Sequence, residues 1–504
     1  MDVAPLSPRV DHAALLPILI ERDETRPLHR QIYEEIQGLI LSGRLGRGAR
    51  LPSSRALAAE LGVSRNTVAA AFDQLLAEGY IEGRVGAGSF VASDLPEEGV
   101  GAPPRPDPAA GSKGPGNLSR RGAMLAAITG GHRRRSPAFT PGLPDMTAFP
   151  FEIWSRLMAK AWRHPPASLL MHGDPAGYAP LRRAIAGYLA TARGVRCDAD
   201  QVIVVAGAQQ AIGLAAHVLT DEGEEAVVED PGYPGVRGAL LAAGLKLVHA
   251  PVDGEGLVVN EAARRAEAPR LICVAPSHQY PLGVTMSLAR RLQLLDWAQR
   301  ADAWIVEDDY DSEYRYLGRP LAALQGMDRA GRVVYVGSFS KVLFPSLRVG
   351  YLVVPEALVD SFLRARRALD DHPSSVAQPA LTAFIEEGHF AAHIRRMRKL
   401  YAGRQAALVE AAERILPDLV RVEASPSGMH LASRLMPELR ARMGDVEAAA
   451  TIAARGITAL PLSGTYAREP AEHGLLLGYA AVPAEEMEAK LTRLAEALRA
   501  AAPG

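Results

Sequence analysis

Apolar residues repeat at helical spacing close to the start of the chain. They stand at Leu28, Ile32, Ile36, Leu39 and Ile40, in the stretch "RPLHRQIYEEIQGLILSG". Positions three and four residues apart share one face of a helix, so this pattern predicts an amphipathic helix that ends near the glycine at position 43.

Two more helices and a hairpin follow this first helix. "LPSSRALAAELG" is a short helix that Ser53 or Ser54 can cap and Gly62 ends, and "VSRNTVAAAFDQLLAEG" is a longer one capped by Ser64. We expect the longer helix to be buried through Val68, Phe72, Leu75 and Leu76. "YIEGRVGAGSFVA" then predicts two short strands around a glycine-rich turn.

This order of elements is typical of a winged helix-turn-helix, which places the start of its last helix in the major groove of DNA. Polar or cationic side chains at that helix start, together with nearby arginines, are the candidate DNA contacts: Ser64, Arg65, Asn66, Thr67, Arg50, Arg55 and Arg84. The segment from Leu51 to Val91 resembles the DNA-binding domain of the GntR family. The alternative is a small three-helix protein-interaction domain. We assign residues 20–93 to this module.

Residues 94–136 are predicted to be a flexible linker. About half of the residues between Leu95 and Gly116 are proline or glycine, a composition that cannot form a packed core. The basic tract from His132 to Arg135 could contact phosphates, although a solvated charge cluster is the simpler interpretation.

From residue 137 to residue 504 the pattern changes to short apolar runs that alternate with helical stretches. The runs are "QVIVVAG", "EAVVED", "RLICVAP", "AWIVEDD", "RVVYVGS" and "RVGYLVV". Continuous apolar strands of this kind favour an α/β fold with a mostly parallel sheet buried between helices. Ligands of such sheets bind beyond the strand ends, so the residues after each strand are the candidates for a site.

The residues after these strands are chemically unusual as a set. They supply a glycine-rich helix start, an aromatic ring, an amide beside a histidine, an acidic segment and a lysine among hydroxyls. Pyridoxal phosphate requires such groups: an amine for its aldehyde, a carboxylate for its ring nitrogen, and hydroxyl, N–H and arginine donors for its phosphate. Taken alone, each of these segments is more often ordinary loop chemistry.

Five motifs make the resemblance specific. "GDPAGYAPLRRAIAGYL", "DPGYPGVR", "PSHQYPLG", "VEDDYDSEYRY" and "GSFSKVLFPSLRVGY" resemble successive motifs of fold-type I aminotransferases. Joined to a GntR-type N-terminus, they resemble the MocR/GabR family of pyridoxal-phosphate-dependent transcription regulators. This resemblance implies an aminotransferase-like domain with a small C-terminal α/β lobe, and a homodimer with its cofactor sites at the subunit interface.

The motifs also imply a role for each matching residue. Lys341 would form the Schiff base with pyridoxal phosphate, Asp308 would pair with the pyridine nitrogen, and Tyr310 would bond the ring hydroxyl. Tyr233 would stack on the ring, with His278 and Gln279 near the ring oxygen. The phosphate would be bound by Ser338, Ser340, Arg348 and the backbone of Gly207, Ala208 and Gln209.

Some positions depart from the family pattern. "AGAQ" replaces the hydroxyl-bearing "SGTQ" at the phosphate turn, and the late strand "HGLLLGYAAVP" lacks the arginine that clamps a substrate carboxylate in many aminotransferases. Arg237 is a weak substitute for that clamp. His172 replaces a tyrosine that reaches the partner's phosphate, and could bind phosphate or simply pack. We interpret Asp309 and Asp311 as a solvated acidic turn or a structural pair.

The bulk properties agree with these interpretations. The net charge is −1, there are two cysteines, and neither a signal peptide nor a membrane span is apparent, so we expect a cytoplasmic protein. The leading hypothesis is a regulator that binds double-stranded DNA and senses an amine, an amino acid or the cofactor. The alternatives are a working aminotransferase with an appended DNA-binding domain, and a structural DNA-binding dimer with an inactive cofactor site.

Overall fold

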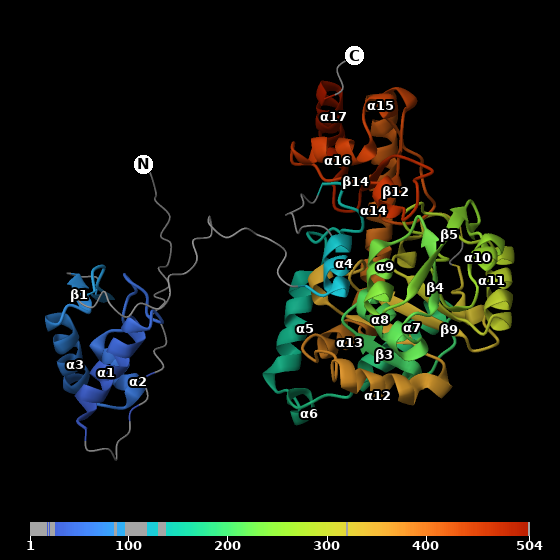
Figure 1. The fold of residues 1–504 in the computed structure, drawn as a ribbon. Helices are drawn as coiled ribbons and strands as arrows, with labels where there is room; N and C mark the ends of the chain where they lie inside the picture. The colour runs from blue at the N-terminus through green and yellow to red at the C-terminus, as the bar shows by residue number, and fades with distance from the viewer. Residues whose placement is uncertain are drawn as a thin grey trace. The chain divides into compact units, whose positions relative to one another are not determined.

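The computed structural model describes Ile18, Ile20 and residues 26–84, 88–95, 118–129, 138–318 and 321–501. It consists of two units, Met1–Asn117 and Leu118–Gly504, which we describe separately (Figure 1). Most of the predicted linker, including the basic tract from His132 to Arg135, lies outside the described residues.

The first unit contains the predicted three helices and hairpin. Its elements are α1 (Leu28–Leu41), α2 (Ser54–Leu61), α3 (Arg65–Ala77), β1 (Ile81–Arg84) and β2 (Gly88–Val91). The two strands pair antiparallel. Ser53 caps α2 by accepting a hydrogen bond from the Ala56 amide at 3.1 Å, and Ser64 caps α3 in the same way through Thr67. The prediction of a winged helix-turn-helix is therefore confirmed.

The core of this unit lies between α1 and α3. Ile32, Ile36, Val68 and Leu75 are fully buried there. Leu76, which we expected to be buried, is 49% exposed. Successive helical residues are about 100° apart, so the face that buries Leu75 turns its neighbour toward solvent.

The second unit is built on an eight-stranded sheet within its described residues. The strand order is β3 (Val202–Val205), β10 (Gly350–Val353), β9 (Val333–Ser338), β8 (Trp304–Asp309), β7 (Pro269–Val274), β4 (Glu225–Asp230), β5 (Lys246–Asp253) and β6 (Gly256–Leu257). The strands from β9 to β5 are parallel, whereas β10 and β6 pair antiparallel with their neighbours. The predicted, mostly parallel sheet is confirmed.

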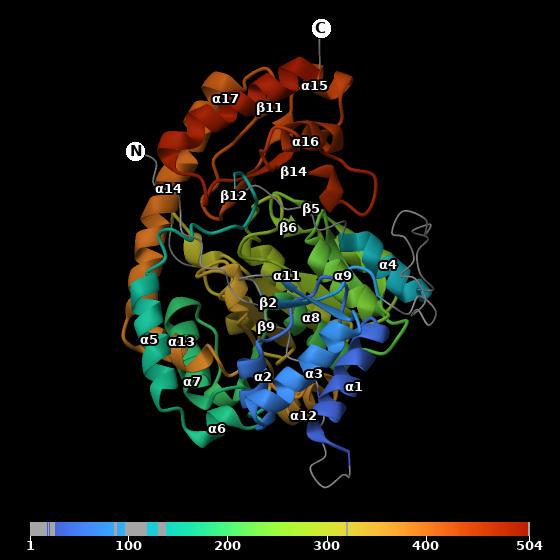
Figure 2. The ribbon, with the colours of Figure 1, turned by 90° about the vertical axis from the view of Figure 1, so that its left-hand side faces the viewer.

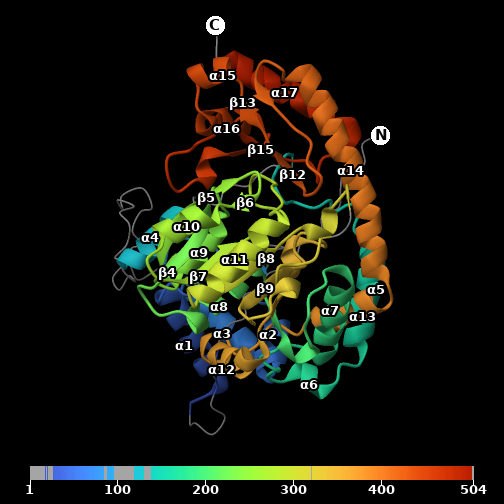
Figure 3. The same cartoon turned by 90° about the vertical axis from the view of Figure 1, so that its right-hand side faces the viewer.

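Helices cover both faces of this sheet (Figures 2 and 3). The alternation along β4 and β7 sends Val228 and Cys273 to one face and Val227 and Ile272 to the other. The first face packs on α8 (Ala208–Leu219), α9 (Pro234–Ala242) and α12 (Val359–Leu369). The second packs on α10 (Val259–Arg265), α11 (Leu288–Arg300), α5 (Phe151–Arg163), α7 (Ala179–Ala192) and α13 (Gln378–Glu386). The short α6 (Ala167–Leu170) follows α5.

A smaller lobe follows the long helix α14 (His389–Ile415) and lies at one end of the unit (Figure 3). Its helices are α15 (Pro437–Arg442), α16 (Asp445–Ala453) and α17 (Ala484–Ala501). Its strands are β11 (Val420–Arg421), β12 (His430–Ala432), β13 (Arg434–Leu435), β14 (Leu460–Pro461) and β15 (Leu475–Gly478). The predicted small C-terminal α/β lobe is thus present.

One helix lies inside the stretch that we assigned to the linker. This helix, α4 (Arg120–Thr129), packs against α9 and places Arg121 Nη2 2.6 Å from Glu222 Oε1. The described part of the second unit therefore starts at residue 118, earlier than the expected boundary at 137. Among the described helices, none combines the length and apolar character that a membrane crossing requires.

Candidate functional site

A cavity of about 380 Å³ opens in the second unit. Its lining combines the carboxyl ends of β4, β7, β8 and β9 with the start of α8 and parts of the small lobe. Ten of the twelve predicted cofactor residues line it: Gly207, Ala208, Gln209, Tyr233, Asp308, Tyr310, Ser338, Ser340, Lys341 and Arg348. The strand ends therefore bring together residues that lie far apart in the sequence.

Lys341 follows β9 and points its amine at the backbone of Gly142. A Cβ atom built on Gly142 would lie 2.3 Å from Lys341 Nζ, so any side chain there would collide with the amine. Burial lowers the pKa of Lys341, although Asp311 and Asp308 act in the opposite direction. A lowered pKa increases the neutral fraction of the amine, which is the nucleophilic form.

Asp308 lies in β8 and carries an oxygen without a partner. Its Oδ1 atom is buried and has no hydrogen bond within the described part of the chain. Burial, followed by the charges of Asp309 and Asp311, raises the pKa of Asp308 to about 7, and Lys341 opposes this rise. A buried carboxylate with an unused oxygen suits a cationic N–H donor in the cavity.

Tyr310 is held by a buried histidine and carboxylate. Its hydroxyl lies 2.9 Å from Nδ1 of His278, and the same nitrogen lies 2.9 Å from Asp311 Oδ1. Asp311 is 1% exposed, so it is not part of a solvated turn. Because the Tyr310 hydroxyl and the Asp311 carboxylate share one ring nitrogen of His278, the chain fixes the direction of the Tyr310 hydroxyl.

The start of α8 and Arg348 bring hydrogen-bond donors and a positive charge to the cavity wall. Helix α8 begins after Gly207, which has a φ of 142° and gives the helix no side-chain cap. The Arg348 guanidinium stands beside this turn, since a Cβ atom on Gly207 would lie 3.5 Å from its Nη1. Ser338 accepts a hydrogen bond from the Ser340 amide at 3.2 Å. Uncapped helix N–H groups with an arginine are a suitable site for a phosphate.

His278 and Gln279 differ from the sequence expectation, because neither lines the cavity. Gln279 is 1% exposed, and its Nε2 donates to the Pro231 carbonyl at 2.8 Å, so it holds backbone segments together. The next residue, Tyr280, lines the cavity instead. Its ring meets that of Tyr233 edge-on, with 5.6 Å between centroids.

Among the lining residues that were not predicted from the sequence, three more have titratable side chains: Glu229, Cys273 and His430. Burial raises the pKa of Glu229 to about 8 and lowers that of His430 to about 3. Glu229 and Cys273 lie within β4 and β7, whereas the sequence prediction covered only the residues at and beyond the strand ends.

Asp309 points away from the cavity, into a buried ion pair. Its Oδ2 lies 2.7 Å from the Arg193 guanidinium and accepts a 2.6 Å hydrogen bond from the Tyr335 hydroxyl. Alternate residues of a strand face opposite sides, so Asp308 and its neighbour are separated by the sheet. The interpretation of Asp309 as a member of a structural pair agrees with this geometry.

The cavity lining contains Arg237 but no arginine from the late strand β15. Nη1 of Arg237 donates to the Thr465 carbonyl at 2.9 Å, and burial lowers the pKa of its guanidinium. Strand β15 is buried throughout, and a Cβ atom on Gly478 would lie 2.1 Å from the Thr140 carbonyl. This strand therefore packs against the segment that carries Gly142.

His172 does not line the cavity. It is exposed in the loop after α6, with Nδ1 3.0 Å from Asp371 Oδ2. Whether it reaches a partner subunit's phosphate stays a prediction.

In the first unit, the start of α3 presents an exposed polar surface. Arg55, Ser64, Arg65 and Asn66 are exposed, and Ser64 Oγ lies 2.8 Å from Thr67 Oγ1. The two other candidate residues, Arg50 and Arg84, belong to the base and strand of the hairpin. Arg50 bridges to Phe90 through its backbone. Arg84 bonds Glu82 at 2.8 Å and stacks over Phe90, so part of its charge is already paired.

These observations define a class of protein: a winged helix-turn-helix joined to an aminotransferase-like unit. Comparison with known families agrees. The model "Aminotransferase class I and II" matches residues 160–494, and "Bacterial regulatory proteins, gntR family" matches residues 28–91.

Similar proteins have the same two-part organisation. The probable rhizopine catabolism regulatory protein MocR of Rhizobium meliloti is 43% identical, over 96% of each chain. The pyridoxine biosynthesis transcriptional regulator PdxR of Corynebacterium glutamicum is 30% identical, over 96% of this chain and 98% of its own. The structure of α-aminoadipate aminotransferase LysN from Thermus thermophilus matches with a TM-score of 0.66 and 28% identity, over 76% of this chain and 95% of that one. This chain therefore belongs to the MocR-type helix-turn-helix transcriptional regulators with an aminotransferase class I domain.

Proposed function

We propose that this transcription regulator holds pyridoxal phosphate through a Schiff base at Lys341 and senses an amine, an amino acid or the cofactor itself. The observation that carries the proposal is the unpartnered, buried Oδ1 of Asp308, in the same cavity as the amine of Lys341. A cationic N–H donor between these two groups would satisfy the oxygen, and the ring nitrogen of the cofactor is such a donor.

The residues present fit the cofactor in three respects. Gly142 leaves the amine accessible, Asp308 offers an acceptor, and the start of α8 with Arg348 offers phosphate donors. When bound, pyridoxal phosphate supplies an aldehyde that reacts with primary amines and a ring that withdraws electrons. The hydroxyls of Ser338 and Ser340 would complete the phosphate site.

Other side chains of the protein hold Lys341 and Tyr310 in position. Tyr314 donates from its hydroxyl to the Val342 carbonyl at 3.2 Å, and Nε2 of His393 lies 2.9 Å from the same oxygen. Both contacts fix the backbone directly after Lys341. In the same way, His278 fixes Tyr310, whose hydroxyl we propose to bond the ring oxygen.

The effector would be an amine, an amino acid or the cofactor itself. The relative PdxR is named for pyridoxine biosynthesis and MocR for rhizopine catabolism, which supports either the cofactor or a separate compound as effector. An effector that bound one arrangement of the unit more tightly than another would shift the populations of those arrangements. We propose that a homodimer then presents two DNA-binding modules to repeated sites, which strengthens binding over that of one module.

The proposal is tested with Lys341→Ala. The wild-type protein, incubated with pyridoxal phosphate, should show the near-visible absorbance of a lysine-bound cofactor. The variant should lose that band and keep the wild-type circular dichroism spectrum. The control is Lys160→Ala, which removes an exposed lysine of α5 and should leave the band intact. A band that persists in Lys341→Ala would contradict the assignment.

The aminotransferase alternative is supported by the similarity to LysN and by Arg237, a cation that lines the cavity. It is separated from the regulator by two measurements on the purified protein. Steady keto-acid formation from amino acids, with no preferential binding to the DNA upstream of its own gene, would favour the enzyme. Selective DNA binding without sustained turnover would favour the regulator.

A further inference from the structure

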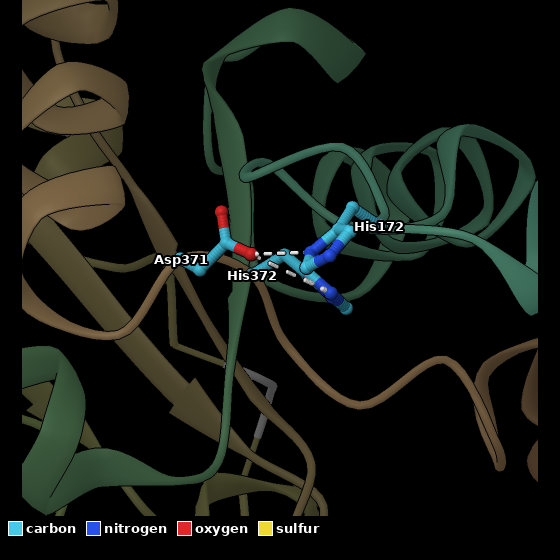
Figure 4. Close-up of side chains that lie close together, drawn as sticks. All are labelled: His172, Asp371 and His372. Atoms are coloured by element: carbon cyan, nitrogen blue, oxygen red, sulfur yellow. Dashed lines mark hydrogen bonds and ion pairs between the residues drawn. The ribbon is translucent and has the colours of Figure 1, made fainter.

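Two loops outside the cavity bring three metal-binding side chains together (Figure 4). His172 follows α6, whereas Asp371 and His372 follow α12. In the figure, both imidazole rings stand on the same side of the Asp371 carboxylate. None of the three lines the cofactor cavity.

The potential ligand atoms converge on one oxygen. His172 Nδ1 lies 3.0 Å and His372 Nε2 lies 3.9 Å from Oδ2 of Asp371, and the three ligand atoms all lie within 4.8 Å of one another. Zinc binds nitrogen and oxygen ligands at about 2.0–2.2 Å, so ligands around one ion are roughly 3–4 Å apart. A small movement of exposed side chains would therefore complete the coordination.

His372 is oriented as metal-binding histidines usually are. Its Nδ1 donates to the Pro373 carbonyl at 3.0 Å, which leaves the lone pair of Nε2 directed toward Asp371. A second ring nitrogen that is bonded to the backbone fixes both the tautomer and the ring orientation. Gly173 permits this arrangement, since a Cβ atom there would lie 3.1 Å from the same Nδ1.

Asp371 supplies the negative charge. Its backbone has a φ of 62°, a left-handed conformation that few non-glycine residues adopt. The side chain is half-exposed, as is needed for an ion to enter from solvent.

We propose that His172, Asp371 and His372 bind a divalent first-row metal ion such as Zn²⁺. Two imidazole nitrogens and a carboxylate form a site for borderline cations, with water in the remaining positions. The neighbouring residue links this site to the phosphate turn. Asp370 accepts a hydrogen bond from Nε2 of Gln210, whose Oε1 accepts one from the Ala206 amide at 2.5 Å.

The test is a titration of ZnCl₂ into full-length, tag-free, cofactor-loaded protein, followed by calorimetry. Asp371→Asn and His372→Ala are the test variants, and asparagine tolerates the left-handed backbone at position 371. His217→Ala is the matched control, because it removes an exposed histidine of α8 that lies outside the cluster. Circular dichroism establishes that each variant keeps its fold.

We expect one zinc ion per chain, with an affinity that falls at least ~10-fold in both test variants and is unchanged in His217→Ala. Co²⁺ should give a visible absorption band that the test variants lose. The proposal is overturned if the wild-type chain binds no zinc in a one-to-one ratio. It is also overturned if the test variants bind as tightly as wild type, or if the control weakens binding equally. Failure of cofactor binding at Lys341 would leave these outcomes unaffected.

Discussion

Replacing Asp308 by asparagine is expected to change the pH dependence of stability in the cofactor-free protein. The Asp308 side chain is buried, and its pKa is raised from 3.8 to about 7, chiefly by burial and then by Asp309 and Asp311. Because the pKa is higher in the folded state, folding takes up a proton between these two pH values. Stability therefore falls as the pH rises from about 4 to about 7.

The size of this effect follows from the interval between the pKa of 3.8 and the pKa of about 7. Each pH unit corresponds to about 1.4 kcal/mol, so an interval of roughly three units gives at most about 4 kcal/mol above pH 7. The asparagine side chain of the variant cannot ionise, whereas its shape matches that of the protonated acid. The variant should thus gain about 2–4 kcal/mol relative to wild type at about pH 8, compared with the difference at about pH 4.

The same substitution should weaken the binding of pyridoxal phosphate, although it raises the stability of the cofactor-free protein above about pH 7. If Asp308 accepts a hydrogen bond from the ring nitrogen, the variant loses a charge-assisted bond that contributes about 1.5–3 kcal/mol. The dissociation constant for pyridoxal phosphate would then rise roughly 10–150-fold. The same substitution would stabilise the empty protein and weaken its binding of the cofactor.

The assay is urea unfolding of the cofactor-free variant and wild type across this pH range, with a parallel cofactor titration by absorbance. Asp360→Asn is the control, since it removes an exposed carboxylate in the first turn of α12 and should change stability by less than about 0.5 kcal/mol. A stability difference that does not vary with pH would refute the assignment of a raised pKa. Unchanged cofactor affinity would refute the contact with the ring nitrogen.

Two pairs of substitutions test the buried ion pair and the DNA-binding surface. Arg193→Ala leaves the buried carboxylate of Asp309 without its cation and should lower the free energy of unfolding by about 3–5 kcal/mol, measured by urea titration. Arg300→Ala, at an exposed pair, is the control and should lower it by less than about 1 kcal/mol. Arg65→Ala should weaken DNA binding and reduce the salt slope by about 1, measured by fluorescence anisotropy at several salt concentrations. Arg84→Ala should have the smaller effect, because Glu82 already pairs with it; a larger effect than that of Arg65→Ala would contradict this reasoning.

The sequence predicts the centre of the fold better than its periphery. Six strands have continuous apolar runs, and all six are present in the central sheet. Strand β5 was missed because "KLVHAPVD" is mixed in character and only partly buried near the edge of the sheet. Helix α4 was missed because it is short and follows a proline-rich stretch, and its packing on α9 depends on contacts that no local pattern encodes.

Some residues of the candidate site could be predicted from the sequence and others could not. Lys341 and Asp308 were predicted because one follows and the other lies at the end of an apolar strand, whereas Arg348 was predicted from its motif alone. Gly142 could not be identified, since its role depends on the approach of a distant loop to the lysine amine. The strand-end motif gave the neighbourhood of His278 but not the direction of its side chain, which contacts Tyr310 and Asp311 and does not line the cavity.

The cavity also gives a physical reason why its occupant could affect the rest of the chain. Asp308 is buried with an oxygen that has no partner, and Lys341 is partly buried with a lowered pKa. A ligand that pairs with both would stabilise the folded unit, by about 2.7 kcal/mol at a hundredfold excess over its dissociation constant. The wall that this ligand would meet includes Gly142 and Tyr233.

Both wall residues are connected to the first described segments of the second unit, residues 118–129 and the segment that begins at residue 138. Gly142 lies in the segment that begins at residue 138 and is tied to the small lobe by the hydrogen bond from the Gly478 amide to the Phe139 carbonyl, at 2.9 Å. Tyr233 precedes α9, on which α4 packs. We therefore expect occupancy of the cavity to change the order of the segments that lead back toward the DNA-binding module. Amide hydrogen exchange of residues 118–129 and 138–150 should then slow when the cofactor binds, and unchanged exchange there would exclude this route.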